Sequence, residues 1–158
     1  MIKLKKIHLV NYCGYRDFEL DLTDGDDVRK LWPELGLSEQ DRSENVARMA
    51  DLAAGIAHSL TSSLIVVACI APYKNTRDWA INRISEFAPC YEVYLTAPLE
   101  ERISRDPKGL YKKAINGEIT GLTGYNGIYE EPTSPDLVFD TNQFTALEIA
   151  EKILQEIK

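Results

Sequence analysis

A cluster of basic residues and the glycine-containing loop after it form the first segment with the chemistry of an anion site. The cations reverse the local charge of a protein whose formal net charge is -7, and such a reversal concentrates phosphates. Glycines at 117, 121 and 124 let the loop bend toward a ligand. We predict a phosphate lid over residues 102–124, with a solvated helix face and an ordinary surface loop as the alternative. The cations are Arg102, Arg105, Lys108, Lys112 and Lys113.

Residues 24–29, Asp-Gly-Asp-Asp-Val-Arg, combine paired acids with an arginine at the end of a predicted strand. In open α/β sheets, ligands gather where strands end. Carboxylates at such a place can hold Mg²⁺ through water or accept a hydroxyl proton, and the arginine can anchor an anionic substrate. An acidic turn is the alternative, because Asp and Gly are common turn residues.

The elements that position these residues alternate between strands and helices from Thr23 onward. Ser38 followed by Asp41 is a helix-start signal, and apolar spacing predicts a helix over residues 39–59. The continuous β-branched run over 64–70 predicts a strand buried on both faces. The pattern predicts an α/β fold, a parallel sheet with helices on both faces. The other expected elements are helices over 28–32, 76–86 and 145–157, strands over 91–95 and 138–139, and the basic helix of the lid.

Residues 1–22 are predicted to form two strands. Phe18, Leu20 and Leu22 alternate with acids, which is the period of a strand with one buried face. Residues 11–15 are too few for a parallel crossover, so an antiparallel hairpin turning near Gly14 is expected, with a bulge near residues 5–6.

Bulk properties limit the classes of function. With 158 residues the chain is expected to be a single domain, 1–158, and its negative charge argues against nucleic-acid and anionic-membrane binding. Cys13, Cys69 and Cys90 have no metal-ligand spacing and fit reduced thiols, which with the absence of a membrane span predicts a cytoplasmic protein. His8 and His58 are isolated and are interpreted as non-catalytic.

The wording of the lid resembles adenylylsulfate kinases. The matching stretches are Asp-Pro-Lys-Gly-Leu-Tyr-Lys-Lys-Ala at 106–114, Gly-Glu-Ile-x-Gly-x-Thr-Gly at 117–124 and Tyr-Glu-Glu-Pro at 129–132, and the likeness extends over 23–158. It implies a three-layer P-loop-kinase-like fold and transfer of the γ-phosphoryl group of Mg²⁺-bound ATP to the 3'-hydroxyl of adenosine 5'-phosphosulfate (APS). The product would be PAPS, the activated donor of sulfate assimilation. The hairpin weakly resembles the opening strands of RecF-like and SMC-like ATPase heads.

The resemblance assigns roles around the acidic motif. Asp26 is implied to act at the acceptor hydroxyl and to hold Mg²⁺ through water, with Asp24 supporting it. Arg29 is implied to contact APS. Leu-Gly-Leu-Ser-x-x-Asp-Arg-x-x-Asn at 35–45 resembles the next family motif and implies that Arg42 and Asn45 also contact APS. A polar helix start is the structural alternative for that motif.

Two leucines depart from the family pattern. Leu37 and Leu122 stand where the family has phenylalanines that sandwich the APS adenine. Stacking on an aromatic ring contributes ~1–3 kcal/mol per base, so leucines hold a base more weakly. A kinase acting on another nucleotide-linked acceptor, such as the family's cytidine diphosphoramidate kinases, is therefore an alternative.

The remaining implied contacts lie after a strand and on the lid. Ala71, Pro72 and Tyr73 resemble the family's Ser-Pro-Tyr and are expected to line the substrate pocket. Arg77 continues that motif as a candidate phosphate contact. The other residues are Lys108, for the acceptor, and Arg105 and Thr141, for the donor nucleotide.

A phosphate-binding loop of the form G-x-x-x-x-G-K-[ST] does not occur in the 158 residues. The hairpin stands where the family has this loop, whose amides are the main electrostatic contribution to phosphoryl transfer. Either the protein belongs to a working kinase whose loop is lost or replaced at this start, or it is a non-catalytic nucleotide-binding module. We predict turnover reduced by orders of magnitude, ATP and APS as small-molecule partners, and a homodimer as the assembly that the family implies.

Overall fold

The computed structural model describes residues 8–9, 18–59 and 64–157; for 8–9, 18–24, 26 and 27 it describes the backbone alone. The chain divides into two compact units, one over residues 3–90 and the other chiefly over 91–158. We describe each unit by itself, and the expected single domain stays a prediction. No helix in the described ranges is long and apolar enough to cross a bilayer.

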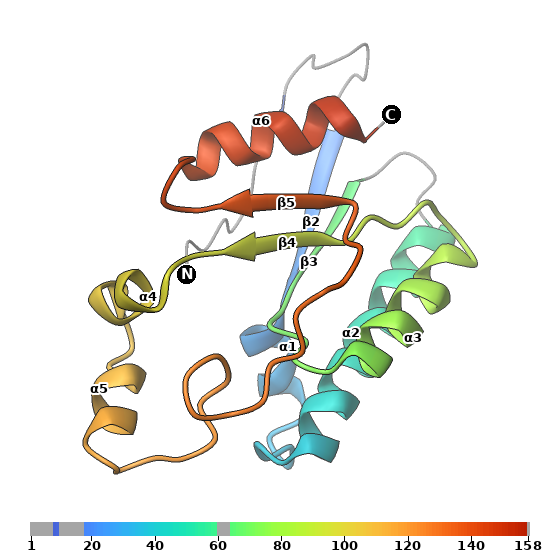
Figure 1. Ribbon diagram of the computed structural model, residues 1–158. Helices are drawn as coiled ribbons and strands as arrows, with labels where there is room; N and C mark the ends of the chain where they lie inside the picture. The colour runs from blue at the N-terminus through green and yellow to red at the C-terminus, as the bar shows by residue number, and fades with distance from the viewer. Residues whose placement is uncertain (1–7, 10–17, 60–63, 158) are drawn as a thin grey trace. The chain divides into compact units, whose positions relative to one another are not determined.

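The first unit contains a three-stranded sheet in the order β1-β2-β3 (Figure 1). β1 (His8–Leu9) pairs antiparallel with β2 (Phe18–Asp24), with His8 opposite Glu19. This pairing confirms the antiparallel hairpin, whereas its turn near Gly14 and the bulge near residues 5–6 lie outside the described residues. β2 pairs in parallel with β3 (Leu64–Ala68), so the hairpin occupies the edge of β2 that faces away from β3.

Three helices complete this unit: α1 (Gly25–Leu31), α2 (Glu39–Ser59) and α3 (Lys74–Ser85). The predicted start of α2 is confirmed, because Asp41 N–H donates to Ser38 Oγ at 3.2 Å and Ser38 N–H donates to Asp41 Oδ2 at 3.3 Å. The Ser38 hydroxyl also lowers the pKa of the Asp41 carboxyl. The predicted apolar face of α2 is confirmed as the core of the unit, with buried Val46, Met49, Ala50, Ala53 and Ala57.

The expectation that the strand after α2 is buried on both faces is wrong. Residues 64–67 of β3 are only half-buried and Ala68 is exposed. The physical reason lies in the helix packing: α2 packs on β3, whereas α3 packs chiefly on α2 and adds a layer beyond it. The β-branched run correctly predicted a strand, but not the cover on its second face.

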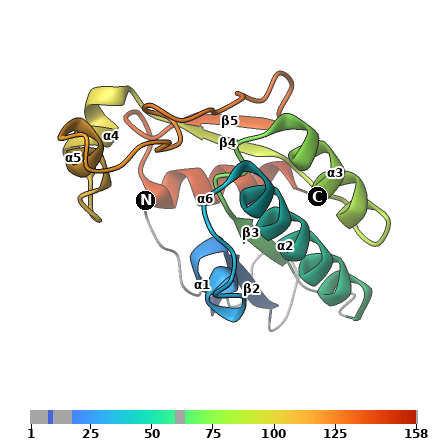
Figure 2. The ribbon, with the colours of Figure 1, turned by 90° about the horizontal axis from the view of Figure 1, so that it is seen from below.

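The second unit contains a parallel pair, β4 (Val93–Thr96) and β5 (Leu137–Asp140), in the register Thr96 opposite Asp140. Between these strands the chain forms α4 (Leu99–Arg105) and α5 (Leu110–Ile115), and α6 (Ala146–Glu156) follows β5 (Figure 2). Thr145 and Glu148 form a capping box at the start of α6. Its predicted apolar face is confirmed, because Ile149 is buried and the other members of that face are half-buried.

The predicted α/β class with parallel strands is therefore confirmed, and most boundaries agree within two or three residues. The predicted short helix over 28–32 begins earlier, at Gly25, directly after the last residue of β2. The lid consists of two short helices, because a turn over 106–109 separates α4 from α5.

Candidate nucleotide site

The end of β2 brings the acidic motif to the place where the sequence predicted it. In the parallel register Asp24 lies opposite Ala68, so both strands end together, and α1 starts at the next residue. Gly25 sits tightly there, since a Cβ on it would lie 3.4 Å from Met49 Sδ and 3.5 Å from the Ala68 carbonyl oxygen. The side chains of Asp24 and Asp26 lie outside the described residues, so their catalytic and Mg²⁺-binding roles stay predictions.

The arginine of this motif reaches across to the next family motif. Arg29 Nη1 donates to the carbonyl oxygens of Leu35, at 3.3 Å, and Gly36, at 2.6 Å. A guanidinium carries five donors, so holding these carbonyls is compatible with binding an anion. This contact ties α1 to the segment that carries the following predicted substrate residues.

Arg42 and Asn45 lie on the first turns of α2, with Leu37 just before the helix. Arg42 Nε donates to the Leu37 carbonyl oxygen at 2.8 Å, while the Leu37 side chain is 70% exposed. Asn45 is only 6% exposed; its Nδ2 lies 3.7 Å from Met49 Sδ, a weak contact. Asn45 Oδ1 has no hydrogen-bond donor among the described residues. A buried acceptor without a donor is costly, which makes this oxygen a candidate to accept from a ligand.

The loop after β3 has an unusual backbone. Ala71 has a φ of 42°, the only positive φ of a described residue other than glycine. Its carbonyl oxygen accepts from Nη1 of the buried Arg77 at 2.8 Å. Ala71 and Pro72 are buried and Tyr73 is half-buried. The sequence gave no signal for this conformation, since alanine rarely adopts it.

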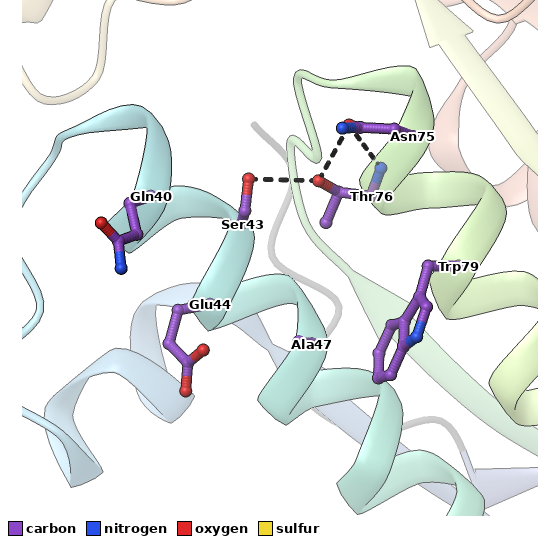
Figure 3. Close-up of a pocket in the computed structure, with 7 residues that line it drawn as sticks. All are labelled: Gln40, Ser43, Glu44, Ala47, Asn75, Thr76 and Trp79. Carbon is purple, nitrogen blue, oxygen red and sulfur yellow. Dashed lines mark hydrogen bonds between the residues drawn. The ribbon is translucent and has the colours of Figure 1, made fainter.

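A surface groove of about 330 Å³ lies between α2 and α3 in the first unit (Figure 3). At its rim Thr76 Oγ1 lies 3.1 Å from Ser43 Oγ, and the figure shows the two hydroxyls directed toward each other. Sequence reasoning missed both residues, although Ser43 lies between two predicted substrate residues on the chain. The groove is lined by Gln40, Ser43, Glu44, Ala47, Asn75, Thr76 and Trp79.

In the second unit, the predicted lid is organised by Asp106 and Gly109. Gly109 has a φ of 66° and precedes α5. Asp106 Oδ2 accepts the Lys112 N–H at 3.0 Å. Loss of solvent raises the pKa of the Asp106 carboxyl, but backbone donors of Lys112, Tyr111 and Leu110 outweigh this and hold it below its ordinary value. Lys108, the predicted acceptor contact, lies exposed in the turn between the helices.

The loop after α5 is held by backbone contacts around Leu122. Its carbonyl oxygen accepts the N–H groups of Tyr125, Asn126 and Gly127, and Leu122 N–H donates to Asn126 Oδ1 at 2.8 Å. The Gly124 carbonyl oxygen accepts from Arg102 Nη1 of α4 at 3.0 Å. The predicted bending is confirmed, since glycines 117, 121 and 124 all have a positive φ.

Arg105 and Thr141, the two residues predicted to bind the donor nucleotide, contact each other. Arg105 Nη1 donates to Thr141 Oγ1 at 2.9 Å, and Nη2 donates to the Thr141 carbonyl oxygen at 3.2 Å and to Asn142 Oδ1 at 3.0 Å. Glu101 accepts from Arg105 Nε at 2.7 Å. The structure thus brings this pair together at the end of β5, while their role toward a nucleotide stays a prediction.

The predicted residues form two separate groups, one in each unit. In the first unit, residues 24–29, 37–45 and 71–73 follow strand ends or begin helices; in the second, Lys108 and Leu122 belong to the lid, and Arg105 contacts Thr141 at the end of β5. Arginines, a buried amide and acids at the ends of parallel strands, together with a basic lid, are the equipment of an α/β kinase.

Comparison with known proteins identifies the family. The profile of the adenylylsulphate kinase family matches residues 8–140. A probable adenylyl-sulfate kinase of Pyrococcus abyssi is 43% identical over 145 residues, covering 89% of this chain and 79% of the relative. The adenylyl-sulfate kinase of Bacillus licheniformis is 38% identical over 142 residues, with 89% and 71% covered. The solved Mycobacterium tuberculosis APS kinase CysC in complex with AMPPNP and APS superposes with a TM-score of 0.79 at 33% identity, covering 86% and 78% of the two chains. The chain belongs to the adenylylsulphate kinase family.

Proposed function

We propose that this protein transfers the γ-phosphoryl group of ATP to the 3'-hydroxyl of APS and so produces PAPS. The observation that carries the proposal is the buried Asn45, whose Oδ1 has no donor among the described residues. It lies on the same helix as Arg42, in a segment that Arg29 holds from α1. The names of the relatives and the APS-bound structure of the Mycobacterium tuberculosis protein support APS as the acceptor.

The residues have the chemistry that an acceptor with sulfate and phosphate groups requires. Arginine presents a planar fork of donors that matches the oxygens of such anions. Arg29 and Arg42 each hold a backbone carbonyl with one nitrogen, which limits the movement of their guanidinium groups. In this proposal the arginines bind the anionic groups, and Asn45 Oδ1 accepts a hydrogen bond from a donor of the nucleoside.

Magnesium bound to ATP fits the acidic motif by its donor set. Asp24 and Asp26 offer carboxylate oxygens, which are the ligands that Mg²⁺ prefers, directly or through water. Bound there, the ion would neutralise charge on the phosphates of ATP. Asp26 would then orient the acceptor hydroxyl, with Asp24 in support.

Two alternatives rest on particular sequence features. Leu37 and Leu122 in place of aromatic residues favour a kinase for another nucleotide-linked acceptor, because a base stacks less well on leucine. The absence of Gly-Lys followed by Ser or Thr in residues 1–158 favours a nucleotide-binding module without turnover. We also propose a cytoplasmic location and a homodimer as the assembly.

Calorimetry and a product assay on one sample test these options. Mg-ATP and then APS are titrated into the pure protein, and the mixture is assayed for PAPS. Binding of both nucleotides with product supports the kinase. Binding of APS without ATP binding or product supports the binding module, and no APS binding refutes the proposed acceptor.

A further inference from the structure

The backbone at Ala71 needs support from its surroundings. Its φ of 42° lies in the left-handed region, where the Cβ of alanine meets the backbone. Pro72 follows and further restricts the conformation of the residue before it. Ala71 is buried, so the strained conformation belongs to the packed part of the first unit. Strain of this kind persists only where neighbouring contacts fix the backbone.

Arg77 supplies such contacts at both ends of the loop. Its Nη1 donates to the Ala71 carbonyl oxygen at 2.8 Å, and its backbone N–H donates to the Tyr73 carbonyl oxygen at 3.1 Å. The residue is 8% exposed, so the side-chain bond lies in a region of low dielectric, where charged donors bind strongly. One residue therefore fixes both sides of Pro72.

The neighbouring residue connects the same loop to α2. Thr76 is buried and its Oγ1 lies 3.1 Å from Ser43 Oγ, across 33 residues of sequence (Figure 3). Ser43 lies on α2 between Arg42 and Asn45, two predicted acceptor contacts. A shift of α3 would thus move the 71–73 loop, and α2 would be coupled to that shift.

We propose that Arg77 and Thr76 are positioning residues of the acceptor site, which hold the 71–73 loop in register with α2. Arg77 acts through the Ala71 carbonyl and does not bind a phosphate group of the substrate. The inference rests on the proposed function, because it names the residues that align two segments of the same acceptor site.

The first test is Arg77→Met, which removes the guanidinium and retains a long side chain. APS is titrated into the full chain by calorimetry, and we expect Kd to rise about tenfold or more, the loss of one charge-assisted hydrogen bond that orders the loop. Arg83→Met is the matched control on the same helix, where the guanidinium binds Asp51 at 2.8 Å and Glu86 at 2.6 Å. It should leave Kd within about twofold, since surface ion pairs contribute little. An unchanged Kd for Arg77→Met would overturn the proposal.

Ala71→Gly separates positioning from direct contact. Glycine adopts a positive φ without steric cost, so a loop with Gly at this position depends less on the arginine. We expect the double variant with Arg77→Met to bind APS about threefold more tightly than Arg77→Met alone. No recovery would mean that Arg77 contacts the acceptor itself. If Arg77→Met does not fold, Arg77→Lys replaces it in the same cycle, because it keeps a charged donor but loses the planar fork.

Thr76 is tested with a pair of variants. Thr76→Val removes the hydroxyl at nearly constant shape and should raise the Kd for APS about threefold, whereas Thr76→Ser keeps the hydroxyl and should restore the wild-type Kd. Equal effects of the two variants would contradict a role for the Ser43 contact.

A measurement without ligand keeps this inference separate from the proposed function. If the wild-type protein binds no APS, the proposed acceptor is wrong, but the contact can still be tested by urea unfolding of the wild type, Ala71→Gly, Arg77→Met and the double variant. A coupling between positions 71 and 77 is expected if Arg77 holds the strained loop. Additive effects would show that it does not.

Discussion

Replacement of Asn45 by leucine should separate the stability of the protein from its binding of the acceptor. Asn45 is 6% exposed and its Oδ1 has no donor among the described residues. Leucine has nearly the same volume and no polar atoms. Asn45→Leu therefore removes an unsatisfied acceptor while the α2 core around Met49 keeps its packing.

The magnitude follows from the two effects of the exchange. A buried acceptor without a donor costs ~1–3 kcal/mol, and the contact between Nδ2 and Met49 Sδ, at 3.7 Å, is too weak to offset it. The free energy of unfolding should stay constant or rise by up to ~1–3 kcal/mol. A hydrogen bond to the acceptor nucleotide contributes ~0.5–1.5 kcal/mol, so its loss should raise the Kd for APS about 2- to 13-fold.

Urea unfolding and calorimetric titration of APS measure the two quantities on the same sample. Asn82→Leu is the control, since it makes the same exchange at an exposed position of α3 and should change neither quantity by much. Asn45→Ala should destabilise the protein, because it leaves a cavity. If Asn45→Leu destabilises the protein by more than ~1 kcal/mol, or binds APS as the wild type does, then Asn45 is a structural residue and the reasoning is wrong.

Three further predictions concern the base, the lid loop and the lid helix. Leu37→Phe should tighten APS binding, by up to the ~1–3 kcal/mol of one stacked base in calorimetry, whereas Leu37→Met should not; equal affinities would contradict stacking at this position. Gly127→Ala should destabilise the loop around Leu122, because its Cβ would lie 2.5 Å from the Gly121 carbonyl oxygen; faster amide exchange of this loop than in wild type is the expected result, and unchanged exchange would contradict the tight turn. The pKa of Asp106 is lowered in the folded protein, so its carboxylate stabilises α5 above the unfolded-state pKa and this contribution is lost as the pH falls through the folded-state pKa; helix amide protection should fall with acid in wild type and not in Asp106→Asn, and parallel curves would refute the capping role.

Local signals in the sequence determined much of the secondary structure. The predicted start and end of α2 agree with the structure because Ser38 and Asp41 complete their hydrogen bonds within one turn. The positive φ of glycines 117, 121 and 124 follows from the freedom of residues without a Cβ. The motif at residues 24–29 was placed correctly at a strand end, because the alternation of Phe18, Leu20 and Leu22 already marked that strand.

Only the tertiary structure decided how distant segments meet. The pairing of β2 with β3 in one register, the single covered face of β3 and the contact of Arg105 with Thr141 across 36 residues depend on packing that no local pattern encodes. The same holds for the φ of Ala71, which a residue with a Cβ adopts only when contacts such as that with Arg77 fix it. The sequence by itself therefore determined the family, the elements and the types of site residue. The fold decided which of these residues support the backbone and which, such as Asn45, keep a polar atom without a described partner, because burial and hydrogen-bond partners are properties of the packed chain.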